Sequence, residues 1–573
     1  MSDALSNDLL SALDARRPPF TMHGMNPPNT RTGVGNPSFR QFMRAALVVI
    51  LSGLCIGKLQ AQADNNPLPH LVTQDGRHAL IVDGAPFLML GAQCHNSSAW
   101  PATLPKVWPA MDYLHANTLE IPVYWEQFEP EPGRFDTSVV DTIIKQAREH
   151  NVRLVLLWFA TWKNGSSHYL PPWMKSQPDK YPRIIGKNGR RVDSPSPHAP
   201  ATLAADIRAF SALMRHLKAK DPQHTVIMVQ VQNEPGSWNT VRDFSPEAEK
   251  LFTSPVPAEL LKAMGTNAPA GGGNWPEVFG TNADEYFHAW HVAHFIGQVA
   301  AAGKAEYPLP MYVNASLRDP LTPGPASKYE SGGATDNVLW IWKVAAPAID
   351  VLAPDIYQND SARYLKVLEL YSRPDNALFV PETGGTSGQA RMCFAALGHG
   401  AIGWSPFGLD YTKYASQPLG APRLTEESLA PVALNYRILG PIMREVARLN
   451  FEGKLQAVAE EKDELKQTLD FGNWQAVVSY GVARNGSPKG NSEPVGRALI
   501  AKIGENEFLV TGAFCRVDFK AAAGGQRDFL RVEEGGYEKG AWRPLYIWNG
   551  DETDWGLDFS SALQVLRVSL GTY

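Results

Sequence analysis

Cysteine is scarce in this sequence, with four residues among 573. Cys55 lies in an apolar N-terminal segment, and the remaining three (Cys94, Cys393 and Cys515) form no CxxC motif and have no histidine at zinc-site spacing. This pattern predicts neither a disulfide framework nor a zinc site. A chain of this length can bury a core that is stable without disulfide bonds.

A charge excess is also missing, because 53 Lys and Arg residues nearly balance 58 Asp and Glu residues. The formal charge of −5 gives no electrostatic reason to expect nucleic acid or an anionic membrane surface as a partner. At 44% hydrophobic residues the chain can bury a large core, which excludes global disorder.

The apolar run at residues 45–57 is too short to anchor the chain stably across a bilayer. Two arginines precede it, and Ala61-Gln62-Ala63 follows as a small-x-small cleavage site. This arrangement is typical of a secretory signal peptide, the alternative being a buried core helix. We predict that residues 1–63 are an export segment with an over-extended start, and that the mature chain begins at Asp64. The protein is then exported to the periplasm or the extracellular space, without a stable membrane span.

Eight short apolar runs alternate with longer amphipathic stretches between Leu80 and Leu449. The runs are residues 87–93, 118–125, 153–159, 225–232, 310–315, 349–357, 377–382 and 401–407, and the stretches include 137–150, 201–219, 282–302, 361–372, 387–398 and 425–448. Runs that are apolar throughout are typical of parallel strands buried on both faces. Eight of them predict a (β/α)8 TIM barrel over residues 64–449. The alternative is a doubly wound open sheet, but no glycine-rich phosphate loop follows the first run.

The pattern changes near residue 450. Residues 474–483, 507–519 and 543–550 alternate between apolar and polar positions, and turns containing Gly and Asn separate them. We therefore predict a smaller antiparallel β domain over residues 450–573, which packs on the barrel.

Three histidines, His288, His291 and His294, recur at intervals of three within a predicted helix. At 100° per residue the outer two lie about 120° apart around the helix axis, so the three rings do not converge on one ion. No HExxH motif accompanies them. We predict no metal site.

Catalytic groups of such barrels lie where the strands end, on the C-terminal face. The fourth strand ends at Glu234, and the seventh ends at Glu382; each glutamate is close to Pro and Gly. A long insertion at residues 236–280 follows Glu234 and is expected at the rim of the site. Two carboxylates facing one cleft suit glycosidic bond cleavage, since one donates a proton to the leaving oxygen while the other attacks or activates water.

The motifs around both glutamates resemble those of known glycosidases. Asn233-Glu234-Pro235 resembles the acid/base signature of the clan A retaining glycosidases, and Glu382 matches their nucleophile position. Within that clan, WEQFEPEPGRFD (125–136) and MVQVQNEPG (228–236) are similar to segments of glycoside hydrolase family 35, the β-galactosidases. From about Leu80 onward the chain looks like the compact bacterial subgroup of that family, some members of which remove galactose from xyloglucan side chains.

The sequence departs from the common family pattern at four positions. Gln232 stands where a Glu is usual, Pro235 replaces a Tyr, and Pro122 replaces a sugar-binding Tyr. Ala160-Thr161-Trp162 stands for the usual Ala-Glu-Trp. These differences bear on sugar selectivity more than on mechanism.

Further strand ends supply candidate substrate-binding residues. By resemblance, Asn233 would bond the sugar 2-hydroxyl, and Tyr357 would hold an oxygen of Glu382. Trp404 is predicted to form the apolar floor under the sugar. The other candidates at the same mouth are Asn96, Glu126 and Trp162.

Together these features predict an exported retaining β-galactosidase that hydrolyses terminal non-reducing β-D-galactose from oligosaccharides or plant polysaccharide side chains by double displacement. Glu382 would attack the anomeric carbon, while Glu234 would act first as acid and then as base. No cofactor is expected, because the two carboxylates perform both tasks. The alternatives are a clan A glycosidase of another β-linked sugar and a non-catalytic carbohydrate-binding barrel.

Overall fold

The computed structural model describes residues 66–412, 424–482 and 486–573. The predicted signal peptide and its cleavage site lie outside these residues. From Asn66 onward the chain forms one compact unit. Among the described residues, no helix is long and apolar enough to cross a membrane.

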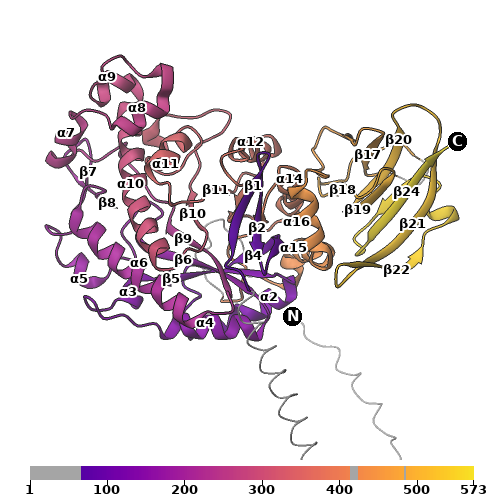
Figure 1. Cartoon of the computed structure of the whole chain (residues 1–573), viewed down its shortest axis with the longest axis horizontal. Coiled ribbons are helices and arrows are strands. Elements are labelled where there is room, and N and C mark those ends of the chain that lie inside the picture. Colours follow the sequence, from indigo (N-terminus) through magenta and orange to yellow (C-terminus); the bar gives the residue numbers. More distant parts are fainter. Residues whose placement is uncertain (1–65, 413–423, 483–485) are drawn as a thin grey trace, which may run out of the picture. The chain divides into compact units, whose positions relative to one another are not determined.

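Parallel strands form the barrel at all eight predicted positions (Figure 1). They are β4 (Met89–Gln93), β5 (Thr118–Tyr124), β6 (Arg153–Lys163), β9 (Val226–Asn233), β10 (Met311–Ala315), β11 (Val351–Ile356), the pair β12 (Phe379–Val380) and β13 (Glu382–Thr383), and β14 (Gly403–Trp404). β12 pairs with β14 and β13 pairs with β11, so the split seventh strand joins the two ends of the sheet. Only Pro381, which has no backbone N–H to donate, separates the two halves. The sheet therefore closes into a barrel, and the open-sheet alternative is excluded.

Helices follow the strands around the barrel. They are α2 (Trp108–Leu114), α4 (Ser138–Glu149), α6 (Pro200–Lys220), α10 (Ala283–Glu306), α11 (Leu339–Ala345), α12 (Ser361–Tyr371), α13 (Ser387–Ala390), α14 (Met392–Gly398), α15 (Glu426–Leu439) and α16 (Met443–Phe451). The sequence pattern did not predict α2 and α11, because seven residues are too few to show a helical period.

Smaller elements precede, interrupt or follow the strands and helices of the barrel and the C-terminal domain. A three-stranded antiparallel sheet, which was not predicted, precedes the barrel, and the insertion at 236–280 contains three short helices in place of a plain loop. These elements are β1 (His70–Gln74), β2 (Arg77–Val82), β3 (Ala85–Phe87), α3 (Trp125–Phe128), α5 (Pro172–Lys175), β7 (Arg183–Ile185), β8 (Arg191–Pro195), α7 (Pro246–Phe252), α8 (Ala258–Met264) and α9 (Trp275–Phe279). Short 3-10 turns are η1 (Leu104–Lys106), η2 (Gly265–Asn267), η3 (Gly280–Asn282), η4 (Ala326–Lys328), η5 (Gly440–Ile442) and η6 (Gly550–Glu552).

The C-terminal part is an antiparallel β domain, as predicted. One sheet has the order β15 (Leu455–Ala459), β18 (Arg497–Lys502), β19 (Glu507–Ala513), β24 (Val565–Thr572), β21 (Arg527–Glu538), β22 (Ala541–Ile547), and the other has the order β16 (Lys466–Asp470), β17 (Trp474–Tyr480), β20 (Cys515–Ala521), β23 (Leu557–Phe559). Apolar side chains between the sheets form a core of their own.

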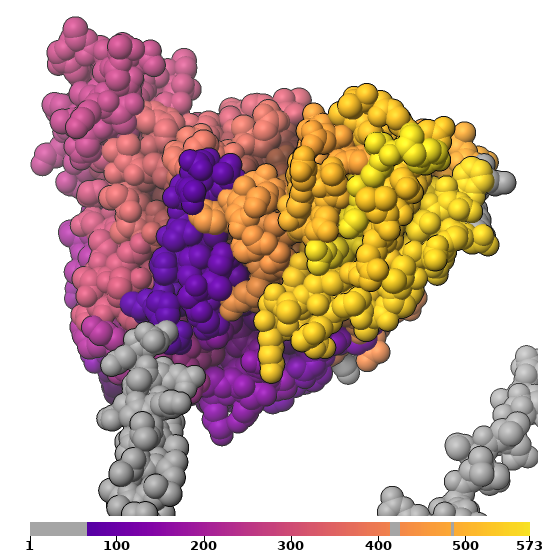
Figure 2. Space-filling model, turned by 45° about the vertical axis from the view of Figure 1, so that its right-hand side comes forward, coloured from indigo at the N-terminus to yellow at the C-terminus, as the bar shows by residue number. Residues whose placement is uncertain are grey.

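The domain packs directly on the barrel (Figure 2). Side chains of β15, including Leu455 and Ala457, join the core of the barrel. Arg497 Nε donates a hydrogen bond of 2.6 Å to Asn435 Oδ1 of α15.

Candidate active site

Glu382 begins β13 and is almost completely buried. Its Oε1 accepts hydrogen bonds from the side-chain amides of Gln93 (2.9 Å), Asn233 (3.1 Å) and Asn314 (3.3 Å). Its Oε2 accepts one from the hydroxyl of Tyr357 at 2.8 Å. Four donors from four strand ends thus point at one carboxyl group and fix its position.

Glu234 follows β9 in a strained turn. Its φ is +40° and that of Gln232 is +67°, a left-handed conformation that residues with a side chain seldom adopt. The Glu234 backbone N–H donates to Asn314 Oδ1 at 2.9 Å, and the Glu234 carbonyl accepts from the Gly165 N–H at 2.9 Å. Hydrogen bonds from two neighbouring segments therefore hold this turn.

The two glutamates lie close together, with Asp355 of β11 beside them. One carboxylate oxygen from each of Glu234, Asp355 and Glu382 lies within 4.8 Å of the other two. Asn314 connects the three, since its Nδ2 also donates to Asp355 Oδ2 at 2.7 Å. Carboxylate oxygens this close could also ligate a cation. In the described part of the chain, this is the group of acidic, His or Cys side chains that has metal-ligand spacing.

Burial and mutual repulsion raise the pKa values of two of these carboxyl groups, those of Glu234 and Asp355. Burial, reinforced by the charge of Glu382, raises the pKa of Glu234 to about 7, although the Lys163 ammonium acts in the opposite direction. Burial and the charges of Glu382 and Glu234 also raise the pKa of Asp355 well above its ordinary value. Glu234 is therefore the carboxyl group of the cluster that exchanges its proton near neutral pH.

A fourth carboxyl group, Glu330, lies behind Glu234 in the segment between β10 and α11. It is 1% exposed, and neither of its oxygens has a hydrogen-bond partner in the described structure. Burial and the charge of Glu234 raise the pKa of Glu330 well above its ordinary value. Lys163, at the end of β6, is the cation that acts on both Glu234 and Glu330.

Of the eight residues predicted from the sequence, the structure brings four together: Glu234, Glu382, Asn233 and Tyr357. Asn96 follows β4 and has a buried Oδ1 without a partner among the described residues. Glu126 lies in α3, where one of its carboxylate oxygens is 3.8 Å from Lys175 Nζ.

The two predicted tryptophans do not join this cluster. The Trp404 indole donates to the hydroxyl of Tyr364 on α12 at 3.0 Å and packs edge-on against Tyr436 of α15. Trp162 packs edge-on against Phe295 of α10. Both side chains therefore pack against helices that surround the barrel strands. The expected apolar floor is therefore not formed by Trp404.

Sequence reasoning missed Gln93, Asn314 and Asp355. Each is a polar residue in an otherwise apolar strand, near the end that faces the site. A buried polar residue in such a run needs a partner, and this was the available signal. The shared partners became apparent only from the order of the strands.

The three histidines of α10 have separate structural partners. His288 Nε2 lies 3.0 Å from Ser237 Oγ, His291 packs against Phe287, and His294 stacks on Trp290. The group with metal-ligand spacing in the described part of the chain does not include them.

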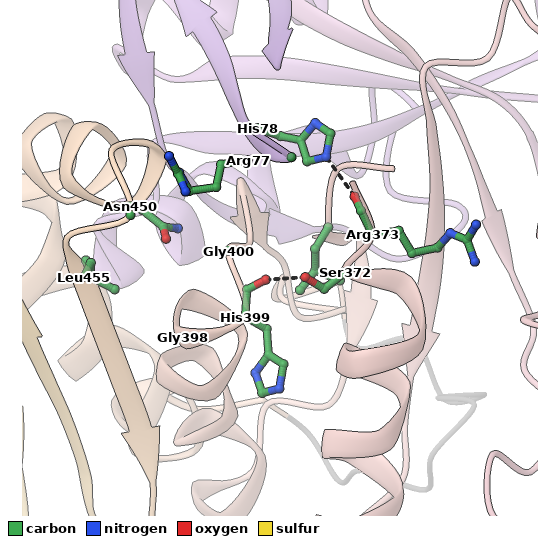
Figure 3. Close-up of a pocket in the computed structure, with 12 residues that line it drawn as sticks. Arg77, His78, Ser372, Arg373, Gly398, His399, Gly400, Asn450 and Leu455 are labelled. Atoms are coloured by element: carbon green, nitrogen blue, oxygen red, sulfur yellow. Dashed lines mark hydrogen bonds between the residues drawn. The ribbon is translucent and has the colours of Figure 1, made fainter. Parts of the chain in front are cut away.

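Two cavities lie away from Glu234, Asp355 and Glu382. A cavity of about 290 Å³ is lined by His78 and Arg373, among other residues (Figure 3). The ring Nε2 of His78 lies 2.9 Å from the backbone carbonyl oxygen of Arg373. Leu378 and Gly400 in its wall precede β12 and β14, so it lies at the end of the barrel where strands begin. A groove of about 860 Å³ lies at the other end, where residues 359–362 and 386–388 follow β11 and β13. The groove therefore opens at the end of the barrel that holds the carboxyl cluster.

Comparison with known proteins agrees with this geometry. Residues 94–277 match the family model described as Beta-galactosidase (glycoside hydrolase family 42). The barrel thus contains a β-galactosidase-like glycoside hydrolase domain of clan A. Residues 432–560 match a model described as a domain of unknown function, DUF5597.

Individual relatives are distant. A β-galactosidase of Xanthomonas manihotis is 27% identical over 207 residues, which are 34% of this chain and 31% of that protein. β-Galactosidase 14 of Arabidopsis thaliana is 27% identical over 146 residues, 24% of this chain and 16% of the relative. The crystal structure of a β-galactosidase from Bacillus circulans sp. alkalophilus aligns with a TM-score of 0.46 at 13% identity, over 63% of this chain and 57% of that chain. The chain thus matches less than a third of either curated relative, and membership of family 35 stays a prediction.

Proposed function

We propose that this protein is a retaining exo-glycosidase that releases terminal non-reducing β-D-galactose from oligosaccharides or plant polysaccharide side chains, including those of xyloglucan. The observation that carries the proposal is the pair formed by Glu382, held by four hydrogen-bond donors, and Glu234, whose pKa is raised to about 7. The similarity of residues 94–277 to β-galactosidases supports galactose as the sugar.

In the first step, Glu382 attacks the anomeric carbon while Glu234 gives its proton to the departing oxygen. A covalent glycosyl-enzyme and the free leaving group result. In the second step, Glu234 takes a proton from water, and the water oxygen displaces Glu382 with overall retention of configuration. One oxygen of each glutamate lies within 4.8 Å of the other, so the two carboxyl groups face the same reaction centre, as the short separation of a retaining pair requires.

The test is to follow a chromogenic β-galactoside by NMR and to trap the intermediate. The first-formed sugar product should be the β-anomer, and a 2-fluoro-substituted galactosyl substrate should label the peptide that contains Glu382. Release of the α-anomer would contradict double displacement. A panel of aryl glycosides separates galactose from another β-linked sugar, and turnover of none of them would favour the carbohydrate-binding alternative.

Export is a separate part of the proposal, supported by the signal-peptide pattern before Asp64. Expression of the full chain with its natural N-terminus should place the mature protein in the periplasm or the medium, and Edman sequencing should start at Asp64. An uncleaved protein in the cytoplasm would contradict it.

A further inference from the structure

An exposed tryptophan stands four residues after Glu234. Trp238 is 40% exposed, although the residues on its N-terminal side are buried. Single exposed apolar side chains are common on protein surfaces and need a reason only when their setting is unusual. Here the setting is unusual in its rigidity and in its neighbours.

The loop that carries Trp238 is fixed to the barrel. Ser237 and Ser331 exchange two backbone hydrogen bonds of 2.8 and 3.1 Å, and Ser237 Oγ lies 3.0 Å from the buried His288 Nε2. The backbone that carries the indole is therefore fixed before any ligand arrives, which lowers the entropic cost of binding.

The ring also lies next to the turn that supports Glu234. A Cβ atom added to Gly165 would lie 3.0 Å from Trp238 Cδ1 and 2.2 Å from Glu330 Oε1, so indole and carboxyl group close over this glycine. Gly165 has a φ of +62° and donates its N–H to the Glu234 carbonyl. Trp238, Glu330 and Glu234 thus meet at one turn.

The role of Glu234 as the acid identifies the part of the substrate that lies next to this turn. Glu234 must contact the oxygen of the bond that breaks, so the leaving group lies on the Glu234 side of the site. The leaving group of an oligosaccharide is a pyranose ring, whose C–H face is apolar and whose edge carries hydroxyl groups. A flat indole matches such a face.

We propose that Trp238 forms the binding position for the sugar ring that is joined to the cleaved bond, that is, the first sugar of the leaving group. This inference rests on the proposed glycosidase function and adds to it the part that selects the leaving group. Trp238 contacts a part of the substrate that does not itself react, and its contribution is lost when that part is missing.

The experiment compares two substrates with the same galactose and different leaving groups. Trp238→Ala should lower kcat/KM on a β-galactosyl disaccharide by about 10- to 100-fold, because the stacking area is lost. On β-galactosyl fluoride, whose leaving group has no sugar ring, kcat/KM should stay within about twofold. Trp238→Phe should keep part of the disaccharide rate.

The matched control is Trp555→Ala, since Trp555 is 53% exposed in the C-terminal domain. It should leave both rates unchanged. An equal loss on both substrates in Trp238→Ala, or no loss on either, would overturn the proposal. If the unaltered protein turns over neither substrate, the proposed function itself has failed, which is a different outcome.

Discussion

The two glutamates of the site differ in what surrounds them. Glu382 is surrounded by neutral donors: three side-chain amides and the phenol of Tyr357. Glu234 lies beside Glu330, with Lys163 as a cation that acts on it, and Asp355 lies beside both glutamates. Hydrogen-bond donors stabilise a carboxylate, whereas burial and the charge of Glu382 raise the pKa of Glu234.

This difference supports the proposed roles without reference to any relative. A nucleophile must be charged, and a general acid must be protonated at the working pH. Both residues are glutamates at strand ends, so their chemistry comes from neighbours on other strands. Asn314 belongs to both surroundings, since it donates to Glu382 and accepts from the backbone of Glu234.

The strongest test of the comparison is to remove the nucleophile. Glu382→Ala should lower kcat by about 10⁴-fold or more on every substrate, because no covalent intermediate can form. Added azide should then yield the galactosyl azide of inverted configuration, since the vacated side is that of the nucleophile. Recovery of the azide with retained configuration would mean that the two roles are reversed.

Removal of the acid should have an effect that depends on the leaving group. Glu234→Ala should cost about 10²- to 10⁴-fold on a disaccharide, whose leaving group needs a proton. On an activated aryl galactoside the first step should survive, the glycosyl-enzyme should accumulate, and azide should restore turnover with retained configuration. Mass spectrometry of the intact protein measures the accumulation. Equal losses on both substrates would argue against an acid role.

The hydrogen-bond donors around Glu382 are tested by Tyr357→Phe, which removes one hydrogen bond to Glu382 Oε2. A hydrogen bond to a charged group of this strength predicts a loss of about 10- to 100-fold in kcat. The control is Tyr364→Phe, because Tyr364 is also buried but its hydroxyl bonds Thr383 and Trp404. Similar losses in both variants, with unchanged folding, would contradict a specific role of Tyr357.

The surroundings of Glu234 are tested by removing the positive charge of Lys163. Lys163 lowers the pKa of Glu234, so Lys163→Met should raise it. Glu234 acts in its protonated form, and activity is lost as the pH rises through that pKa. The basic limb of kcat/KM, expected near pH 7 in the unaltered protein, should therefore move to higher pH. Lys175→Met is the control, since Lys175 faces Glu126 at 3.8 Å and not this cluster. A shift to lower pH would reverse the assignment.

The strands and both glutamates were predictable because their signals are local. A strand buried on both faces must be apolar throughout, and catalytic groups of a parallel barrel lie at the C-terminal ends of its strands. Glu234 and Glu382 could therefore be found from their positions after the fourth and seventh runs. The contacts that distinguish them were not local. Asn314 reaches both only because β9, β10 and β11 are neighbours and the split seventh strand follows them.

The direction of the side chains was the second feature that the sequence did not predict. Trp162 lies four residues after Trp158 on the same strand, and Trp158 donates to Asp206 of α6 on the outer face. Thr161 also donates to Asp206, because the pairing of β6 with β9 shifts register between Trp158 and Lys163, so simple alternation could not place Trp162. For Trp404 there is no alternation to use, because β14 has only two residues. Glu330 lies in a segment of Pro, Gly and Ser, where no regular pattern indicates its position.

The smallest expected effect on catalysis concerns Trp404. Because its ring packs outward against Tyr436 and donates to Tyr364, Trp404→Phe should lower the free energy of unfolding by about 1–3 kcal/mol through lost packing and one lost hydrogen bond. The KM for a β-galactoside should remain within about twofold, since no substrate contact is removed. Urea unfolding and steady-state kinetics on the same preparation measure the two quantities. A large rise in KM at unchanged stability would mean that the indole contacts the sugar after all. The surroundings of Glu382 would then include an aromatic ring under the sugar.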